Sequence, residues 1–164
     1  IAQAYAIFNH DTIRDRIFEI FRKLCKTKCM ESIYTTHNYI SVTEEFPMLR
    51  KGAIDASENR KVCIPFNMRD GIAICMGKGN AQWLCSAPHG AGRIMTRNQA
   101  RKQIPLSEYE SSMTGIFSTS VCPETLDESP QAYKSADEIL SLITPTVDVI
   151  SFVKPKFNIK DTGK

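Results

Sequence analysis

One of the three histidines in this chain, His89, lies in a segment of small residues that reads Ser-Ala-Pro-His-Gly-Ala-Gly-Arg. Gly90 and Gly92 leave the backbone open, so a phosphate group could approach main-chain N–H groups there. Arg93 and Arg97 could donate charged hydrogen bonds to its oxygens. A neutral imidazole in this position could attack phosphorus, act as a general acid or bind a metal. A loop histidine bonded only to backbone is the alternative, and the segment alone does not decide.

The other two histidines stand in different settings. His37, followed by Asn38, lies in a stretch of β-branched and aromatic residues, where a satisfied core histidine is the favoured interpretation and a metal ligand is the alternative. His10 is interpreted as a surface or capping residue. Cys25 and Cys29 are four residues apart but have no second pair at zinc spacing. The chain therefore has no His, Asp and Cys cluster sufficient for a metal site on its own.

Basic residues gather near the predicted loops. Such a distribution suits a phosphate-rich ligand, although a solvated charged face is the simpler interpretation. Three aromatic residues, Phe66, Tyr133 and Phe157, could stack on a base, but core packing is the more usual role. The basic residues in question are Arg50, Lys51, Arg60, Lys61, Arg69, Lys78, Arg93, Arg97, Arg101 and Lys102.

The elements that must position these residues can be read from hydrophobic spacing. Apolar residues at helical spacing predict an amphipathic helix over Asp11–Cys25, with Asp11 as its cap. Short stretches rich in Ile, Val, Tyr and Thr predict strands at 32–42, 61–66, 71–76 and 147–153. Two Ser-x-x-Glu boxes predict helices around 109–113 and 139–143, with Ser107 and Ser135 as caps.

Strands and helices do not alternate in a βαβ rhythm, which favours an α+β fold with a mixed or antiparallel sheet and flanking helices. The chain has 164 residues, of which 42% are hydrophobic and 24% charged, as expected of one globular domain. The glycine-rich loops 77–80 and 89–93 lie where functional loops tend to be. A net charge of +3 gives only weak support to a polyanionic partner.

The six cysteines are scattered in a chain with enough apolar residues to fold without disulfides, so they are expected to be reduced. No segment approaches the roughly 18 to 20 continuous apolar residues of a membrane span, and none resembles a signal peptide. A cytoplasmic protein that does not bind membranes is therefore expected. The first residue, Ile1, is not a start methionine, so we expect a piece of a longer protein.

Taken in order along the chain, a set of short motifs resembles the RtcB-type 3′-phosphate RNA ligases, the tRNA-splicing ligase RtcB family. The resemblance runs from about Ala2 to Lys160 and favours an RtcB-like fold, of which this is the C-terminal part. The motifs are Arg-Lys-Gly-Ala at 50–53, Ile-Pro-x-Asn-Met-Arg-Asp-Gly at 64–71, Gly-Lys-Gly-Asn at 77–80, Ser-Ala-Pro-His-Gly-Ala-Gly-Arg at 86–93, Met-Thr-Arg at 95–97, Ser-Thr-Ser-Val at 118–121 and Ala-Tyr-Lys at 132–134.

This resemblance implies a concrete activity. Enzymes of this type use GTP and manganese to join an RNA 3′-phosphate, or a 2′,3′-cyclic phosphate opened first, to a 5′-hydroxyl end in tRNA splicing and RNA repair. GMP is carried on a histidine as a phosphoramidate and then passes to the RNA 3′-phosphate. The alternatives are a non-catalytic nucleotide- or RNA-binding remnant and a histidine-dependent phosphohydrolase.

The resemblance also implies residue roles. By position His89 is the histidine that carries GMP, and His37 is a manganese ligand. The residues that resemble the nucleotide site are His37, Asn38, Pro65, Phe66, Asn67, Met68, Ile72, Gly90, Ala91, Gly92, Tyr133 and Lys160.

Three departures from the family pattern stand out. Ile72 replaces a common serine, which removes a hydroxyl from the nucleotide pocket, and Thr96 replaces a frequent serine. The other manganese ligands of the family lie upstream of the first residue, so residues 1–164 are expected to be the C-terminal part of a single catalytic domain whose N-terminal metal-ligand half is absent. That half is an expected partner. Its absence should leave apolar strand surface exposed and ligation weak.

Overall fold

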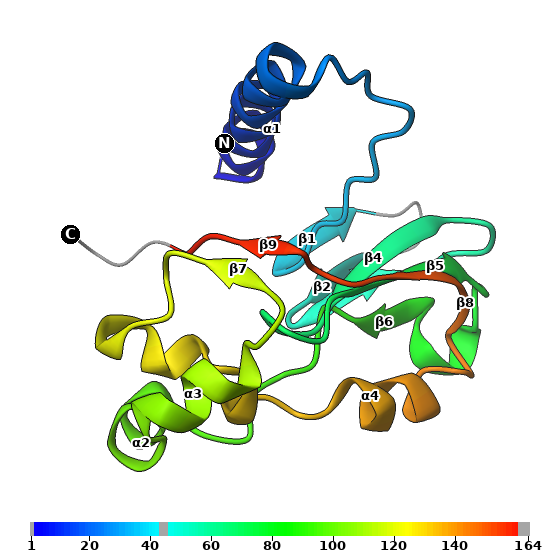
Figure 1. Ribbon diagram of the computed structural model, residues 1–164. Helices are drawn as coiled ribbons and strands as arrows, with labels where there is room; N and C mark the ends of the chain where they lie inside the picture. The colour runs from blue at the N-terminus through cyan, green and yellow to red at the C-terminus, as the bar shows by residue number, and fades with distance from the viewer. Residues whose placement is uncertain (1, 43–45, 161–164) are drawn as a thin grey trace. The chain divides into compact units, whose positions relative to one another are not determined.

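The computed structural model describes residues 2–42 and 46–160. The chain forms two compact units, Ile1–Tyr34 (unit 1) and Thr35–Lys164 (unit 2). Helices and small sheets are both present, which confirms the predicted α+β class (Figure 1). None of the described helices is both long and apolar enough to cross a membrane. The assignment of residues 1–164 to one catalytic domain stays a prediction.

Unit 1 contains one long helix, α1 (Ala2–Cys25), which has no buried residue. The helix ends at the predicted residue, and Arg22 and Lys23 lie in its last turn, where cations interact favourably with the helix dipole. The predicted start at Asp11 is wrong, because no Pro or Gly interrupts the segment before it and alanine-rich sequence continues the helix. The Asp11 carboxylate instead accepts a hydrogen bond from Arg14 at 2.8 Å.

Unit 2 is built from short strands in four small sheets (Figure 1). Three sheets are antiparallel and one strand pair is parallel, in agreement with the predicted mixed sheet. The pairs and their bounds are β1 (Tyr39–Val42) with β2 (Pro47–Arg50), β3 (Ala53–Asp55) with β6 (Ser86–Pro88), β5 (Ile72–Gly77) between β4 (Lys61–Pro65) and β8 (Val147–Val153), and parallel β7 (Phe117–Ser118) with β9 (Phe157–Asn158).

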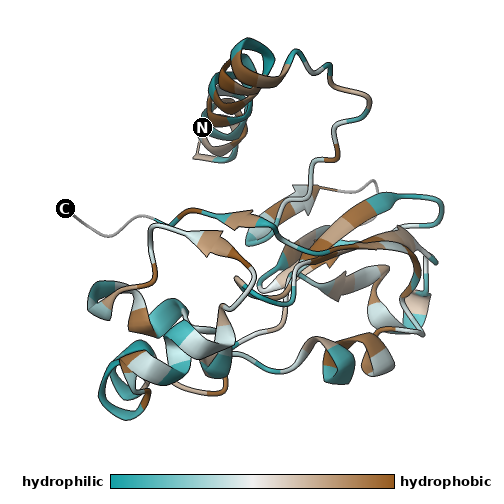
Figure 2. Ribbon diagram, in the orientation of Figure 1, coloured by the Kyte–Doolittle hydropathy of each residue, from teal (hydrophilic) through white to brown (hydrophobic). Residues whose placement is uncertain are grey.

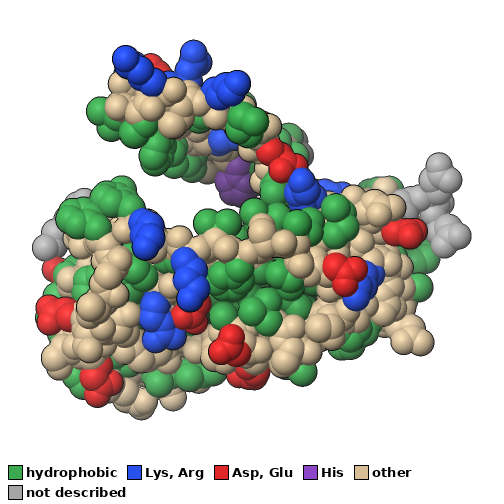
Figure 3. Space-filling model, turned by 45° about the vertical axis from the view of Figure 1, so that its right-hand side comes forward, with side chains coloured by type: hydrophobic (Ala, Val, Ile, Leu, Met, Phe, Trp, Pro, Cys, Tyr) green, Lys and Arg blue, Asp and Glu red, His purple; other side chains and the backbone are tan. Residues whose placement is uncertain are grey.

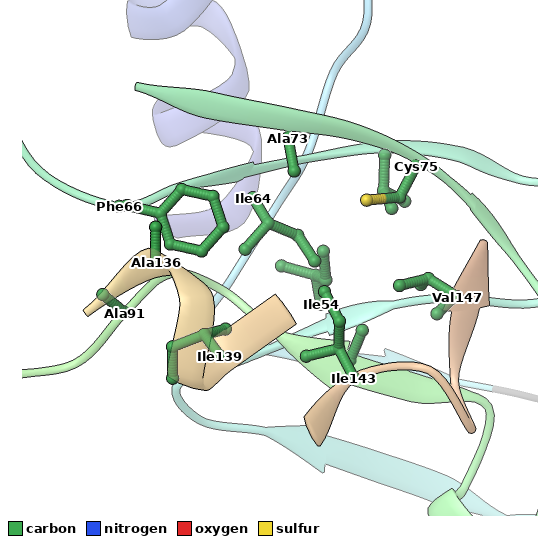
Figure 4. Close-up of a cluster of buried hydrophobic side chains, with 13 residues drawn as sticks. Ile54, Ile64, Phe66, Ala73, Cys75, Ala91, Ala136, Ile139, Ile143 and Val147 are labelled. Atoms are coloured by element: carbon green, nitrogen blue, oxygen red, sulfur yellow. The ribbon is translucent and has the colours of Figure 1, made fainter. Parts of the chain in front are cut away.

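The main core of unit 2 lies between these strands and α4 (Ala136–Leu142) (Figure 4). Val62 and Ile64 of β4 alternate with more exposed residues, which is the period expected of a strand with one buried face. They meet Ile139 and Ile143 from the α4 side. The predicted Ser135 cap is confirmed, because its hydroxyl accepts a hydrogen bond from the Glu138 backbone N–H at 3.1 Å.

Five other helical segments lie within the described residues of unit 2. The predicted Ser107 cap is wrong: α3 (Leu106–Ser112) begins one residue earlier, after Pro105, whose fixed φ suits a helix start. The helix α2 (Arg97–Gln103) was not predicted, although Thr96 and Gln99 form a reciprocal capping box at its start. Three 3-10 turns complete the set, η1 (Ala81–Trp83), η2 (Pro123–Glu128) and η3 (Pro130–Ala132).

The predicted strand at 32–42 is correct only from Tyr39 onward. Asn38 adopts φ 57°, a left-handed conformation that an extended strand cannot contain. Burial is uneven along β8, where only the first residue, Val147, is buried. Exposed apolar residues of this strand are Val149, Ile150, Phe152 and Val153, and Figure 2 shows the apolar colouring of the strands. The predicted exposure of apolar strand surface is therefore present.

Replacement of Ile64 by alanine tests the core directly. The side chain is fully buried between β5 and α4, so Ile64→Ala should lower the free energy of unfolding by about 2–5 kcal/mol through lost burial and the cavity left behind. Urea unfolding followed by circular dichroism measures it. Ile94→Ala is the matched control, because Ile94 is 59% exposed and the change should stay within about 0.5 kcal/mol. Equal effects of the two variants would contradict this core assignment.

Candidate functional site

The pairing of β3 with β6 places Gly52 opposite His89. Ala53 pairs with Pro88 in this antiparallel ladder, so the next residue on each strand faces the other. The His89 backbone N–H donates to the Gly52 carbonyl at 3.3 Å, and His89 Nδ1 lies 2.8 Å from the same oxygen. Gly52 belongs to the Arg-Lys-Gly-Ala motif at 50–53, and this motif is the sequence signal that points to it.

The hydrogen bond to Gly52 sets the state of the imidazole. A carbonyl oxygen can only accept, so Nδ1 must carry the proton. In the neutral ring Nε2 then holds the lone pair, which makes it the nucleophilic or metal-binding nitrogen. His89 also lines a pocket, as a nucleophilic or metal-binding histidine must.

Two other predicted residues lie beside His89. The rings of His37 and His89 are stacked, with centroids 4.9 Å apart and planes 17° from parallel. Asn38 Oδ1 accepts a hydrogen bond from the Gly52 N–H at 2.8 Å. Both polar groups of Gly52 are thus engaged, one by Asn38 and one by His89, and the structure brings His37, Asn38 and His89 together.

A pocket of about 850 Å³ opens next to His89 and lies wholly within unit 2. Its apolar side is formed by the end of β4, the start of β5 and the segment from β8 to β9. Its polar side carries Arg93, Arg97, Tyr133 and Lys160. Figure 3 shows Lys and Arg side chains beside an apolar area of the surface. A pocket of this size and composition suits a ligand with both a planar apolar part and negative charge.

The predicted segment 65–68 lines the pocket, and its side chains also make contacts that stabilise the fold. Phe66 is buried and stacks on Phe152 with centroids 5.7 Å apart, while Met68 accepts a hydrogen bond from Tyr109 in a second cluster. Asn67 Oδ1 accepts the backbone N–H groups of residues 69 and 70, which fixes the turn. Pro65, the last residue of β4, pairs with Ile72, the first residue of β5, and Ile72 is 39% exposed.

The glycines after His89 are required by close approach and by backbone conformation. A Cβ on Gly90 would come within 2.7 Å of the Pro65 carbonyl oxygen, so a side chain there would force β4 away. Gly92 has φ +68°, which L side chains rarely adopt, and its Cβ position is open. Ala91 between them is buried in the main core. The loop is thus anchored at Ala91 while its glycine backbone faces the pocket.

The polar wall of the pocket centres on Glu128, which sequence reasoning missed. Arg93 Nη2 donates to Glu128 Oε1 at 2.7 Å, and the Tyr133 hydroxyl donates to Oε2 at 2.8 Å. Lys160 Nζ donates to Oε2 at 3.3 Å. The pKa of Tyr133 is raised to about 12, mainly by burial and then by the hydrogen bond and the charge of Glu128. The Tyr133 hydroxyl therefore keeps its proton. The acidic pair Asp127 and Glu128, shortly before the Ala-Tyr-Lys motif, was the sequence signal that could have identified Glu128.

Asp127, the neighbour of Glu128, holds helix α2. Its buried carboxylate accepts hydrogen bonds from Arg97 at 2.8 Å and Arg101 at 3.1 Å. Burial alone would raise the pKa of Asp127, but the hydrogen bond and charge of Arg101, with the charge of Arg97, hold it below its usual value. Arg101 is thus held by Asp127, and Arg93 and Lys160 by Glu128, while Arg97 lies near both carboxylates.

Most of the other basic residues serve the fold. Arg50 is 7% exposed and donates to Ser86 Oγ at 3.0 Å, while Arg60 pairs with Asp55 at 2.7 Å. Arg69 pairs with Asp70, and Lys78 bonds the Thr144 carbonyl and Asp148. None of these residues lines the pocket. The glycine loop 77–80 is likewise tied to residues 144–146 rather than to the site.

A metal bound by His37 would need further His, Cys, Asp or Glu ligands. Within residues 2–42 and 46–160, no group of three or more His, Cys, Asp or Glu side chains is arranged to hold a metal ion. Cys25 and Cys29 are exposed free thiols, and Cys29 lies beyond the end of α1. His37 alone does not make a manganese site, which needs several oxygen and nitrogen ligands.

The family model described as tRNA-splicing ligase RtcB matches residues 1–161. The chain belongs to the RtcB family. This confirms the resemblance drawn from the motifs around His89, and the mixed helices and small sheets agree with an RtcB-family domain.

Three RtcB relatives show how much of the family this chain represents. It is 31% identical to the RNA-splicing ligase RtcB of Escherichia coli K12 and 32% identical to RtcB1 of another Escherichia coli strain. Each match covers 91% of this chain and 39% of the relative, so the chain spans well under half the length of these curated relatives. The tRNA-splicing ligase RtcB of Pyrobaculum aerophilum is 34% identical over 84 residues, 48% of this chain and 17% of the relative.

The depressed pKa of Asp127 predicts a pH-dependent contribution to stability. Because the folded-state pKa is lowered, the contribution is present above the usual pKa of about 3.9 and is lost as pH falls through the folded value. Asp127→Asn should lower the free energy of unfolding by about 1–3 kcal/mol at pH 7, with the difference from wild type shrinking toward pH 3. Urea unfolding at several pH values measures it.

Asp148→Asn is the control for that series. Its carboxylate is 71% exposed in an ion pair with Lys78, and such surface pairs contribute about 0–1 kcal/mol. A pH-independent effect of Asp127→Asn would contradict the assigned pairing.

Proposed function

We propose that this chain supplies the nucleotide pocket and the guanylylated histidine of a GTP- and manganese-dependent RNA ligase. The ligase would join RNA 3′-phosphate or 2′,3′-cyclic phosphate ends to 5′-hydroxyl ends. The single observation that carries the proposal is His89 at the edge of the 850 Å³ pocket, with Nδ1 held by the Gly52 carbonyl. Membership of the RtcB family, whose relatives are named RNA-splicing ligases, supports the reaction class.

The first step follows from the fixed tautomer. The Nε2 lone pair of His89 attacks the α-phosphorus of GTP, an N–P bond forms, the bond from that phosphorus to the bridging oxygen breaks, and pyrophosphate leaves. The carbonyl of Gly52 stabilises the positive charge that develops on the ring, because Nδ1 keeps its proton and donates it to that oxygen.

The flanking residues hold the phosphate in line for this attack. The open backbone at Gly90 and Gly92 allows the phosphate to come close, and Arg93 and Arg97 supply positive charge on the same side of the pocket. Afterwards GMP passes from His89 to the RNA 3′-phosphate, and the 5′-hydroxyl oxygen displaces it. The base would lie toward Ile72, Phe66 and the Tyr133 and Lys160 side.

The described residues do not complete a manganese site. In this proposal His37 contributes one ligand, and the remaining ligands come from outside residues 2–42 and 46–160. The same observation favours a second candidate function for the chain by itself, a nucleotide-binding module without catalysis. GTP binding by the chain without transfer of GMP would identify that case.

Labelling tests the nucleophile. The chain is incubated with GTP labelled in its α-phosphate and with manganese, with and without the part of the Escherichia coli relative that it does not match. His89 should take up the label in the complete mixture, and His89→Ala should reduce labelling to background because no Nε2 remains.

His10→Ala is the matched control, since His10 is an exposed residue of α1, and its labelling should equal that of wild type. Label retained by His89→Ala, or no label on the chain while the intact relative is labelled, would contradict the proposal.

The residue at position 72 gives a test of base recognition. Ile72 lines the pocket without a hydrogen-bonding group, so Ile72→Ser should lower the Kd for GTP by about three- to tenfold by adding one hydrogen bond. Isothermal titration calorimetry with GTP, and with ATP for comparison, measures it. Ile94→Ser, at an exposed position outside the pocket, should change neither Kd. Weaker GTP binding by Ile72→Ser would show that this position contributes apolar contact instead.

A further inference from the structure

Glu128 is the carboxylate among the described pocket-lining residues, and it stands among cations from three separate segments. Arg93 comes from the loop after β6, Lys160 follows β9, and Arg97 begins α2. The Glu128 side chain is 19% exposed and lies within 2.7 to 3.4 Å of a nitrogen of each. A single half-buried acid thus meets the converging positive charge of the pocket.

Without this acid, those cations would repel one another. Like charges held a few ångströms apart in a partly buried site destabilise each other, and flexible Arg and Lys side chains escape by turning toward water. Glu128 has two oxygens in fixed directions: Oε1 accepts from Arg93, and Oε2 accepts from Tyr133 and Lys160. The pocket keeps an excess of positive charge, since Arg93 and Lys160 together face the single charge of Glu128, while Arg97 is also paired with Asp127 at 2.8 Å.

Glu128 also sets the direction of the Tyr133 hydroxyl. Its proton goes to Glu128 Oε2 at 2.8 Å, and Arg93 Nη2 donates to the hydroxyl oxygen at 2.8 Å. A phenol oxygen has two acceptor positions, so one remains for an N–H group of a ligand. The guanidinium of Arg93 lies 4.7 Å from the centroid of the Tyr133 ring, which fixes the pair further.

We propose that Glu128 is a positioning residue, which holds Arg93, Tyr133 and Lys160 in the geometry that binds a nucleoside triphosphate. This inference rests on the proposed function, because the ligand is GTP. Asp127 does not share the role, since its carboxylate is turned to Arg97 and Arg101 and supports α2.

The sign of one binding change tests the inference. Glu128→Gln keeps the size of the side chain and removes one negative charge from a pocket that binds a polyanion. If Glu128 only opposed the ligand electrostatically, the variant would bind GTP more tightly. As a positioning residue, its loss should instead raise the Kd for GTP by about tenfold, because an amide can donate to Tyr133 and no longer holds the cations.

The Kd values come from isothermal titration calorimetry of the whole chain with GTP and with inorganic tripolyphosphate, and thermal unfolding checks that each variant folds. Tripolyphosphate binding should weaken as well, because Arg93, which faces the phosphates, is displaced. Glu110→Gln, on the exposed face of α3, removes the same charge and should leave both Kd values within about twofold.

Glu128→Asp is the second variant and decides the question if Glu128→Gln does not fold. It keeps the charge but is one methylene shorter, so it cannot reach Arg93 and Tyr133 together, and GTP binding should again weaken. An unchanged or lower Kd in the folded variant overturns the inference. Absence of GTP binding by the wild-type chain contradicts the proposed function itself, which separates the two failures.

Discussion

The Gly52 carbonyl is the group on which the site of unit 2 depends. One oxygen accepts from both the main chain and the ring of His89, and the N–H of the same residue is held by Asn38. The positive φ of Gly52 allows this, since few other residues adopt it without strain. Through this one residue, the end of the β1–β2 hairpin and the end of β6 are held together, and the His37 ring stacks on His89.

The pocket has two chemically different sides, and each arises from a different part of the fold. The apolar side is the continuation of the β4–β5–β8 sheet, where Ile72 and Val153 are paired across neighbouring strands. The cationic side comes from segments outside the named strands, where Arg93 and Tyr133 form an isolated antiparallel bridge and ion pairs to Asp127 and Glu128 hold the side chains. The apolar side and the cationic side of the pocket are thus held by independent interactions.

The sequence predicted the elements with strong periodicity and the residues within compact motifs. The β8 strand agrees with its predicted bounds because Val, Ile and Phe fill most of its positions, and the Ser135 cap follows from a local hydrogen bond. The roles of Gly52 and Glu128 could not be predicted, since they depend on distant partners. His89 is 37 residues from Gly52, and Lys160 is 32 residues from Glu128. Asn38 misled the strand prediction because its left-handed backbone serves the site.

Residues 157–160 complete the pocket through contacts with a segment 40 residues earlier. The parallel β7–β9 pair, the stacked Phe117 and Phe157 rings and the two hydrogen bonds between Ser120 and Lys160 hold this last wall. Closing such a long loop carries an entropic cost and is slow compared with hairpin formation. During synthesis, His89 and its glycine loop can therefore fold while the pocket is still open on one side. A pocket that can bind its ligand arises only when β9 pairs with β7.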